Sequence, residues 1–259
     1  MRPRDGGFIL VVVLWTMALL ALIATQMTGG TRLSTARATA LRAAAVAAAA
    51  ADGLVSEAIF HLLDSGPGHW EPNGQRRPIR LPRGEAEVIA SREAGRINLN
   101  TAPPALLAAV LEAVGVPSAR ARPLAMLIYQ FHLPGPGDAA PYRAAGLPYT
   151  PPGTAFRATE DLGLIPGIDA GLIARLGPHV TAHGDGRVDP AAASPFVRRI
   201  LHSIAADSQP PPGADGSPEV VRIEVVVRLR DATARRLVIV RPDPSAESPG
   251  QVIEILRWQ

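Results

Sequence analysis

The sequence predicts an α+β fold: a long N-terminal helix packed on an antiparallel sheet, with an all-helical domain inserted within the sheet. Three observations predict it. Residues 31–63 contain no proline and are dominated by Ala, Leu and Arg, which favour helix. Residues 78–92 and 219–256 hold runs that alternate apolar and polar side chains, as half-buried strands do. Residues 95–206 instead carry the start signals of short helices.

Composition excludes several classes of function. The 259 residues leave room for one large or two small domains. All 26 basic residues are Arg, and they are scattered among 23 acids for a net charge of +3, which is no nucleic-acid footprint. The absence of cysteine excludes disulfides, thiolate catalysis and Cys-ligated metals.

Residues 8–27 form an apolar run of about 20 residues, enough to cross a hydrocarbon core of about 30 Å. A cleaved secretory signal is a poorer interpretation, because its apolar region is shorter and ends in small residues, whereas Leu22 and Ile23 occupy that place. Arg2 and Arg4 precede the run. They predict a single-pass protein with a cytoplasmic N-terminus and the remaining chain outside.

Beyond the membrane, the helix is expected to continue to Leu63 and to become amphipathic. Leu54, Ala58 and Leu62 recur at four-residue spacing and mark its apolar side. One helix over residues 8–63 would be about 84 Å long at roughly 1.5 Å per residue. Its apolar side is expected to pack on the sheet.

Two groups of strands are expected to form that sheet. Residues 78–81 and 85–92 flank the turn Pro82-Arg83-Gly84 and suggest a hairpin. Near the C-terminus, the segments EVVRIEVVVRLR, RRLVIV and QVIEIL predict three further strands, at residues 219–230, 235–240 and 251–256.

INLNTAPPALL, from Ile97, and LIPGIDAGLIARL, from Leu164, resemble helix-hairpin-helix modules that grip DNA phosphates through backbone amides. The second glycine of each turn is replaced here. Pro117 offers no N–H in the first turn, and Asp169 adds a negative charge in the second. Both changes oppose phosphate binding, so we interpret the hairpins as packing units and expect no nucleic-acid partner.

Other polar residues support few chemical roles. Asn98 and Asn100 are expected to hold a turn, and His179 and His183 to be solvated histidines without the Glu of a zinc motif. No nucleophile, acid pair or phosphate loop stands out, so the chain is not expected to be an enzyme. The acids Asp185 and Asp189 in HGDGRVD are candidates for a calcium site, although their spacing is not that of the twelve-residue calcium loop and a solvated turn fits them as well.

The N-terminus carries the most specific pattern. A short basic leader ends in Gly7 and is followed by Phe8 and a membrane helix that continues into an amphipathic one. This arrangement resembles the leader of type IV prepilins and pseudopilins, and the resemblance implies that a prepilin peptidase cuts after Gly7 and that Phe8 becomes the methylated N-terminus. Most members have glutamate at the fifth mature position, where this chain has Val12. A valine cannot accept the amine of an incoming subunit, which suits the end of a filament.

The leader without its acid, together with INLNTAPPALL inside a helical insertion, resembles the minor pseudopilin K family of type II secretion. The resemblance implies a place at the tip of a periplasmic pseudopilus, bound to minor pseudopilins I and J. It also implies an inner-membrane machine that exports folded proteins from the periplasm across the outer membrane, which makes the exported substrate a candidate partner. Members can hold calcium in the part of the molecule that contains Asp185 and Asp189.

This interpretation divides the chain into five parts: a leader at 1–7, the transmembrane half of the helix at 8–27, the periplasmic half and first strands at 28–94, the insertion at 95–206 and the last strands at 207–259. Two alternatives share some of these features. A minor pilin of a type IV pilus shares the leader, and a membrane-tethered helix-hairpin-helix DNA-binding protein shares the hairpins.

Overall fold

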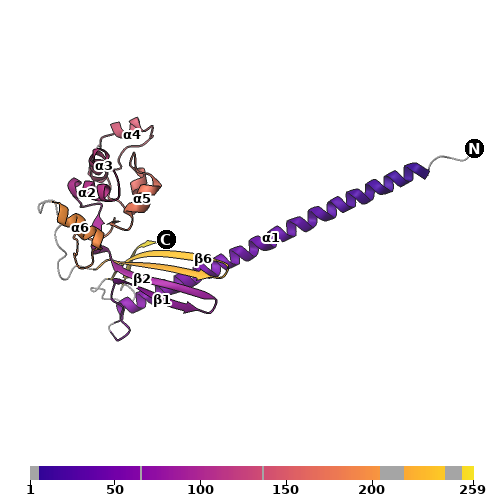
Figure 1. Cartoon of the computed structure of the whole chain (residues 1–259), viewed down its shortest axis with the longest axis horizontal. Coiled ribbons are helices and arrows are strands. Elements are labelled where there is room, and N and C mark those ends of the chain that lie inside the picture. The colour runs from indigo at the N-terminus through magenta and orange to yellow at the C-terminus, as the bar shows by residue number, and fades with distance from the viewer. Residues whose placement is uncertain (1–5, 65, 136, 205–218, 243–252) are drawn as a thin grey trace, which may run out of the picture.

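The structure is a computed structural model that describes residues 6–64, 66–135, 137–204, 219–242 and 253–259; for residues 6–9 and 23–35 it describes the backbone only. One long helix projects from a head made of a sheet and a separate group of short helices (Figure 1). The predicted leader residues 1–5 lie outside the described part, as do residues 207–218 of the predicted C-terminal unit.

The projecting helix, α1 (Gly6–Leu63), has 58 residues and is therefore about 87 Å long. It is unbroken across Gly29 and Gly30, so the single helix expected from the sequence is confirmed. Runs of Ala and Leu explain this continuity, because neither residue loses much side-chain freedom in a helix.

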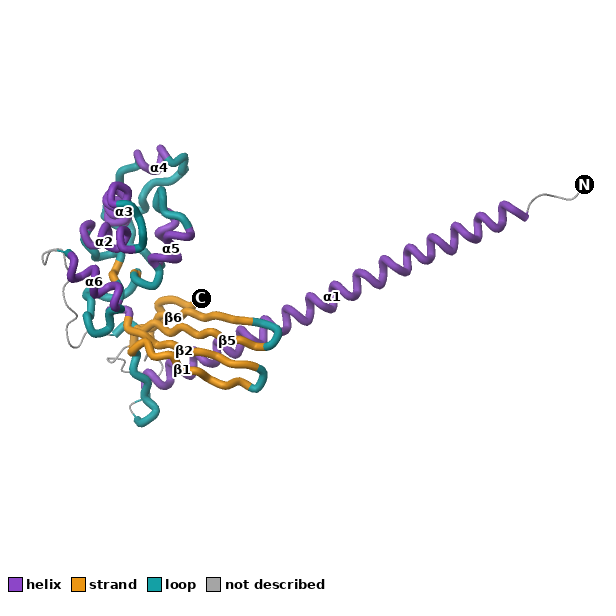
Figure 2. The backbone as a smooth tube through the Cα atoms, in the orientation of Figure 1, coloured by secondary structure: helices purple, strands orange, loops and turns teal. Residues whose placement is uncertain are grey.

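A five-stranded antiparallel sheet forms the body of the head, in the order β1-β2-β5-β6-β7 (Figure 2). The expected hairpin is present, with the first strand beginning earlier than its apolar pattern suggested. The C-terminal segments supply the other three strands. The strands are β1 (Asn73–Leu81), β2 (Gly84–Arg92), β5 (Val221–Leu229), β6 (Thr233–Pro242) and β7 (Ile253–Trp258).

The C-terminal half of α1 packs on one face of this sheet. Leu54, Val55 and Ala58 are at most 5% exposed and meet Val225 and Val238 of the central strands. Burying one such aliphatic side chain contributes about 1.5 to 3 kcal/mol. The predicted packing of helix on sheet is therefore confirmed.

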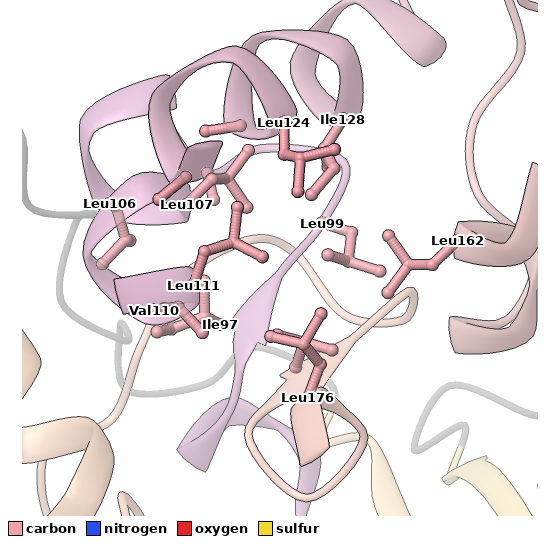
Figure 3. Packing of buried hydrophobic residues seen from close by; sticks show 14 of the residues in the cluster. Ile97, Leu99, Leu106, Leu107, Val110, Leu111, Leu124, Ile128, Leu162 and Leu176 are labelled. Atoms are coloured by element: carbon pink, nitrogen blue, oxygen red, sulfur yellow. The ribbon is translucent and has the colours of Figure 1, made fainter. Parts of the chain in front are cut away.

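A second core lies between β2 and β5 in the chain and belongs to the insertion (Figure 3). Leu106 and Leu111 of one helix pack with Leu124 and Ile128 of the next and with Leu162. The elements are η1 (Glu93–Gly95), β3 (Ile97–Asn98), α2 (Pro104–Ala113), α3 (Ser118–Phe131), α4 (Ala140–Ala144), η2 (Thr159–Leu164), α5 (Ala170–Leu176), β4 (Val180–Thr181) and α6 (Pro195–Ser203).

The insertion differs in one respect from the all-helical expectation. The two short strands β3 and β4 pair in parallel, Ile97 with Val180 and Asn98 with Thr181. Each strand is only two residues long, below the length at which periodicity is visible in a sequence. The pair closes the insertion by joining its first segment to a segment more than eighty residues later.

Candidate assembly site

The N-terminal part of α1 is an apolar rod that projects from the head (Figure 1). Within Leu10–Leu22 the large side chains are exposed, including Trp15 at 71% and Val12 at 44%. A continuous apolar surface of this kind is stable only when lipid or other apolar helices cover it. This single apolar helix near the N-terminus fits a membrane anchor.

A second stretch of α1 also has the length and hydropathy of a membrane span. Residues Ala36–Leu63 have a mean hydropathy of 1.5, but their C-terminal half carries Ala51, Leu54 and Val55, which form the core with the sheet. The hydropathy of Ala36–Leu63 therefore reflects packing in the head, and the exposed rod before it is the better anchor. Part of the predicted span 8–27 is described by its backbone alone.

The start of the rod contains the predicted processing point. α1 begins at Gly6, so the bond between Gly7 and Phe8 lies within its first turn. Each glycine weakens a helix by about 1 kcal/mol relative to alanine, so this turn opens more easily than the aliphatic turns that follow.

At the other end of the molecule, ion pairs hold the insertion on the sheet. Glu93 is buried and pairs with Arg222, which lies on the sheet face opposite α1. Arg96 reaches Glu93 at 3.5 Å and Glu224 at 3.9 Å. Burial acts to raise the pKa of Glu93, but the charges of Arg222 and Arg96 outweigh it and lower the pKa below its ordinary value. The carboxylate is therefore the charged centre of this junction.

Three further ion pairs support the same junction from its sides. Arg92, the last residue of β2, pairs with Glu219 and lies 3.5 Å from a carboxylate oxygen of Asp189. Arg257 of the edge strand β7 donates to Glu160 of η2 at 2.7 Å. These contacts join the sheet to two separate loops of the insertion, which fixes the direction in which the insertion points.

Asn98 and Asn100 are structural, as predicted, but they hold more than one turn. Asn98 accepts from the Asn100 N–H at 2.8 Å and donates to the carbonyls of His183 and Gly184. Asn100 donates to the carbonyls of Phe156 and Ala182 and accepts from the Phe156 N–H at 2.7 Å. The two amides thus tie together three loops that lie far apart in the sequence.

The expectation of two solvated histidines is wrong. His179 stacks on Phe196 with ring centroids 3.9 Å apart, and its Nδ1 is buried. The Nε2 of His183 is buried as well. Burial lowers the pKa of both rings, so both favour the neutral form. A sequence does not reveal this, because neither ring meets a neighbour close in the chain.

The calcium candidates lie in exposed turns. Asp185 accepts the N–H of Arg187 at 3.0 Å, and its other oxygen lies 3.6 Å from the same residue's guanidinium. Asp189 accepts the N–H of Ala191 at 2.8 Å and faces Arg92. Nowhere in the described part of the chain do three or more His, Asp or Glu side chains gather around one point that suits a metal ion. A calcium site built from these two acids stays a prediction.

The second hairpin turn of the insertion packs against α3, the helix that follows the first turn. Gly115 and Gly167 both have positive φ, as tight turns require, and the Arg120 guanidinium donates to the carbonyl of Gly167. In the second turn, Asp169 accepts the N–H of Leu172 at 2.7 Å and so occupies the start of α5. A phosphate would have to displace that carboxylate, which supports the interpretation of these hairpins as packing units.

Comparison with known proteins now adds to this geometry. Residues 92–185 match the family described as type II secretion system (T2SS), protein K. These residues form a type II secretion protein K domain. The match begins at Arg92 of the junction and covers both hairpins, and it confirms the predicted resemblance to the minor pseudopilin K family.

The fold gives a second comparison. A chain of the crystal structure of the GspK-GspI-GspJ complex from the enterotoxigenic Escherichia coli type 2 secretion system is similar with a TM-score of 0.57. The sequences are 17% identical, and the alignment covers 88% of this chain and 98% of that chain. At that identity the likeness is one of fold, and it confirms the predicted α+β class. A comparison with curated proteins found no significant match.

Sequence reasoning missed the junction that carries the protein K domain. Glu93 and Arg222 look like ordinary strand-end and strand residues, and their pairing depends on the return of the chain to β5. One signal was present: Arg222 and Glu224 are charged residues at alternate positions within an aliphatic strand, so they share a face. Charged residues at alternate positions are, however, also what a solvent-facing side of a strand shows, so this pattern does not by itself reveal that the insertion covers that face.

Proposed function

We propose that this minor pseudopilin of type II secretion occupies the tip of the pseudopilus, in the export of folded proteins from the periplasm across the outer membrane. In this role the rod of α1 crosses the inner membrane with its N-terminus in the cytoplasm. The head and its insertion lie in the periplasm.

The observation that carries the proposal is Val12. A carboxylate enclosed by apolar membrane helices must meet the amine of a neighbouring subunit, because a lone charge costs up to about 2.5 to 3.5 kcal/mol within a transmembrane helix. Val12 is an exposed apolar residue of the rod and has no group to accept an amine. The chain can place its own amine against the subunit below and offers nothing to a subunit above.

The insertion supports the same place. It extends the head beyond the sheet (Figure 1), and the ion pairs of Glu93 and Arg257 hold it in one orientation. A rigid, enlarged head obstructs close packing in a shaft, where neighbours surround each subunit. At the tip of the pseudopilus the enlarged head has no neighbour above it.

The leader sequence indicates how the chain is processed. A prepilin peptidase is expected to cut after Gly7 and the new N-terminus, Phe8, to be methylated. The two glycines at the start of α1 support this step, since a peptidase needs an extended substrate and this turn unwinds at low cost. The proposed partners are minor pseudopilins I and J, by likeness to the chain found in the GspK-GspI-GspJ complex, and the exported protein is a further candidate.

The variant Val12→Glu tests the proposed position at the tip of the pseudopilus. It adds the missing acceptor, so we expect the chain to appear within the shaft and secretion of a reporter substrate to fall. Immunogold labelling of assembled pseudopili and the secreted fraction of the substrate provide the readouts. Val11→Glu is the matched control, because it adds the same charge on another side of the helix. Unchanged position and secretion in Val12→Glu would contradict the tip assignment.

A further inference from the structure

A groove of about 940 Å³ lies at the end of the sheet nearest the projecting rod. α1 forms one wall, from Thr39 to Val46. The other walls are the turn between β1 and β2, residues 82–85, and the turn between β5 and β6, residues 228–232. Figure 2 shows both turns at the edge of the sheet where α1 leaves the head.

The walls of this groove are strongly basic. Four arginines and two acids line it, and all six are exposed residues. No ion pair joins them to each other or to other side chains in the described residues, in contrast to the paired arginines of the junction. The six are Arg42, Arg83, Arg228, Arg230, Glu85 and Asp231.

The backbone holds the two turns in place. Gly84 lies so close to β5 that a Cβ atom there would meet the carbonyl oxygen of Arg228 at 2.1 Å. The residues around it pair in regular register, from Gly84 with Leu229 to Glu85 with Arg228. The arginines therefore project from a rigid floor, which favours recognition of a partner with a matching arrangement of charge.

A lipid surface is the less suitable partner. If the anchor ends at Met27, Arg42 lies 15 positions further along a continuous helix, about 22 Å from the membrane surface. Lipid charge is screened over about 8 to 10 Å at physiological salt. A protein surface at the level of the groove is better placed.

The position of the groove indicates which protein surface it contacts. It lies at the end of the head from which the rod of α1 leaves, and in the proposed role a tip subunit meets its neighbours on that side. We infer that the groove receives an acidic segment of the head of the minor pseudopilin packed directly beneath this chain. This inference rests on the proposed function and adds to it the surface and the charge of the contact.

The test uses the full chain, produced in membranes together with its own minor pseudopilin partners. The variant Arg83→Glu with Arg230→Glu reverses two charges of the groove without touching the core. We expect the affinity for the partner complex, measured after detergent extraction, to fall by about tenfold or more, because like charges then face each other. Binding by the unmodified chain is expected to weaken as salt rises, and this salt dependence is expected to be smaller in the variant.

The matched control is Arg175→Glu with Arg199→Glu, which reverses two exposed arginines of the insertion, on α5 and α6. It is expected to bind the partners as the unmodified chain does. Full binding by the groove variant would overturn the inference, and so would a loss of binding to anionic vesicles with partner binding intact. If the unmodified chain itself fails to bind minor pseudopilins, the proposed function fails instead, so the two failures are distinguishable. A photocrosslinker at position 83 that joins to an acidic segment of the partner would confirm the contact.

Discussion

Glu93 and Arg222 form a buried ion pair although 129 positions separate them in the chain. The side chain of Glu93 is fully buried and that of Arg222 is 8% exposed. The pair stands where the chain leaves β2 for the insertion, and the Glu93 N–H also donates to the carbonyl of Val220 at 2.8 Å. The exit and the return of the insertion are thus joined by both side chain and backbone.

Replacement of Glu93 by glutamine is expected to destabilise the head strongly. The amide keeps the shape of the side chain but removes the nearest counter-charge of Arg222 and Arg96, which are left with Glu224 at 4.0 and 3.9 Å. Breaking a buried pair in this way costs about 3 to 5 kcal/mol. Denaturant unfolding of the detergent-solubilised chain, followed by circular dichroism, measures the change.

Arg76→Met is the comparison for that variant. Arg76 pairs with Glu87 at 3.0 Å on the exposed surface of the sheet, so its loss is expected to cost less than about 1 kcal/mol. Equal effects of the two variants would show that the junction is not a buried electrostatic centre.

Stability is expected to fall as the solution becomes mildly acidic, in part through His179. Burial and the nearby charge of Arg96 lower the pKa of His179 below its ordinary value of 6.5. Between that value and the lower folded one, the unfolded state binds more protons. The contribution of His179 is therefore complete above the unfolded pKa and is lost as pH falls through the folded pKa.

The variant His179→Phe removes this titration while keeping an aromatic ring against Phe196. Unfolding free energy measured from neutral pH to about pH 5.5 is expected to decline less in the variant than in the unmodified chain. His183, with its own lowered pKa, leaves a smaller residual slope. Identical pH profiles of the variant and the unmodified chain would mean that His179 does not contribute to the loss of stability in acid.

Replacement by alanine is expected to change the stability of the head in opposite directions at two glycines. At Gly95 a Cβ atom would meet the carbonyl oxygen of Ala192 at 2.3 Å, so Gly95→Ala forces the backbone apart and costs about 1 to 3 kcal/mol. At Gly53, on the exposed side of α1, nothing lies within 4 Å, and Gly53→Ala is expected to add about 0.5 to 1 kcal/mol. Thermal unfolding of both variants checks the signs, and a stabilising Gly95→Ala would refute the close approach.

Asn100→Ala is expected to loosen the insertion. It removes the partner of the Phe156 N–H and of two carbonyls, and unpaired buried backbone groups cost about 1 to 3 kcal/mol each. Hydrogen exchange at Phe156 is expected to accelerate as the loops separate. Asn73→Ala, which removes one exposed turn contact, should leave exchange there unchanged; similar protection in both variants would argue against the role of Asn100.

Repeating local patterns made most of the fold predictable. The helix formers of α1 and the alternation in EVVRIEVVVRLR act over a few residues, so each element follows from its own segment. Thr159 shows the limit of this reasoning. It is the first residue of η2 and a hydroxyl there is a usual cap, but Asp161 accepts the N–H groups of Arg157 and Ala158 instead. Several oxygens within one turn compete for the same donors, and packing decides among them.

The sequence by itself determined the apolar rod, the valine at position 12 within it, the strand segments and the helical character of the insertion, because these depend on composition and short-range spacing. Only the tertiary structure decided the junction of Glu93 with Arg222, the burial of the histidines and the basic groove beside α1. Each of those brings together segments far apart in the chain. Their contacts arise from the return of the chain to the sheet, which no local pattern records.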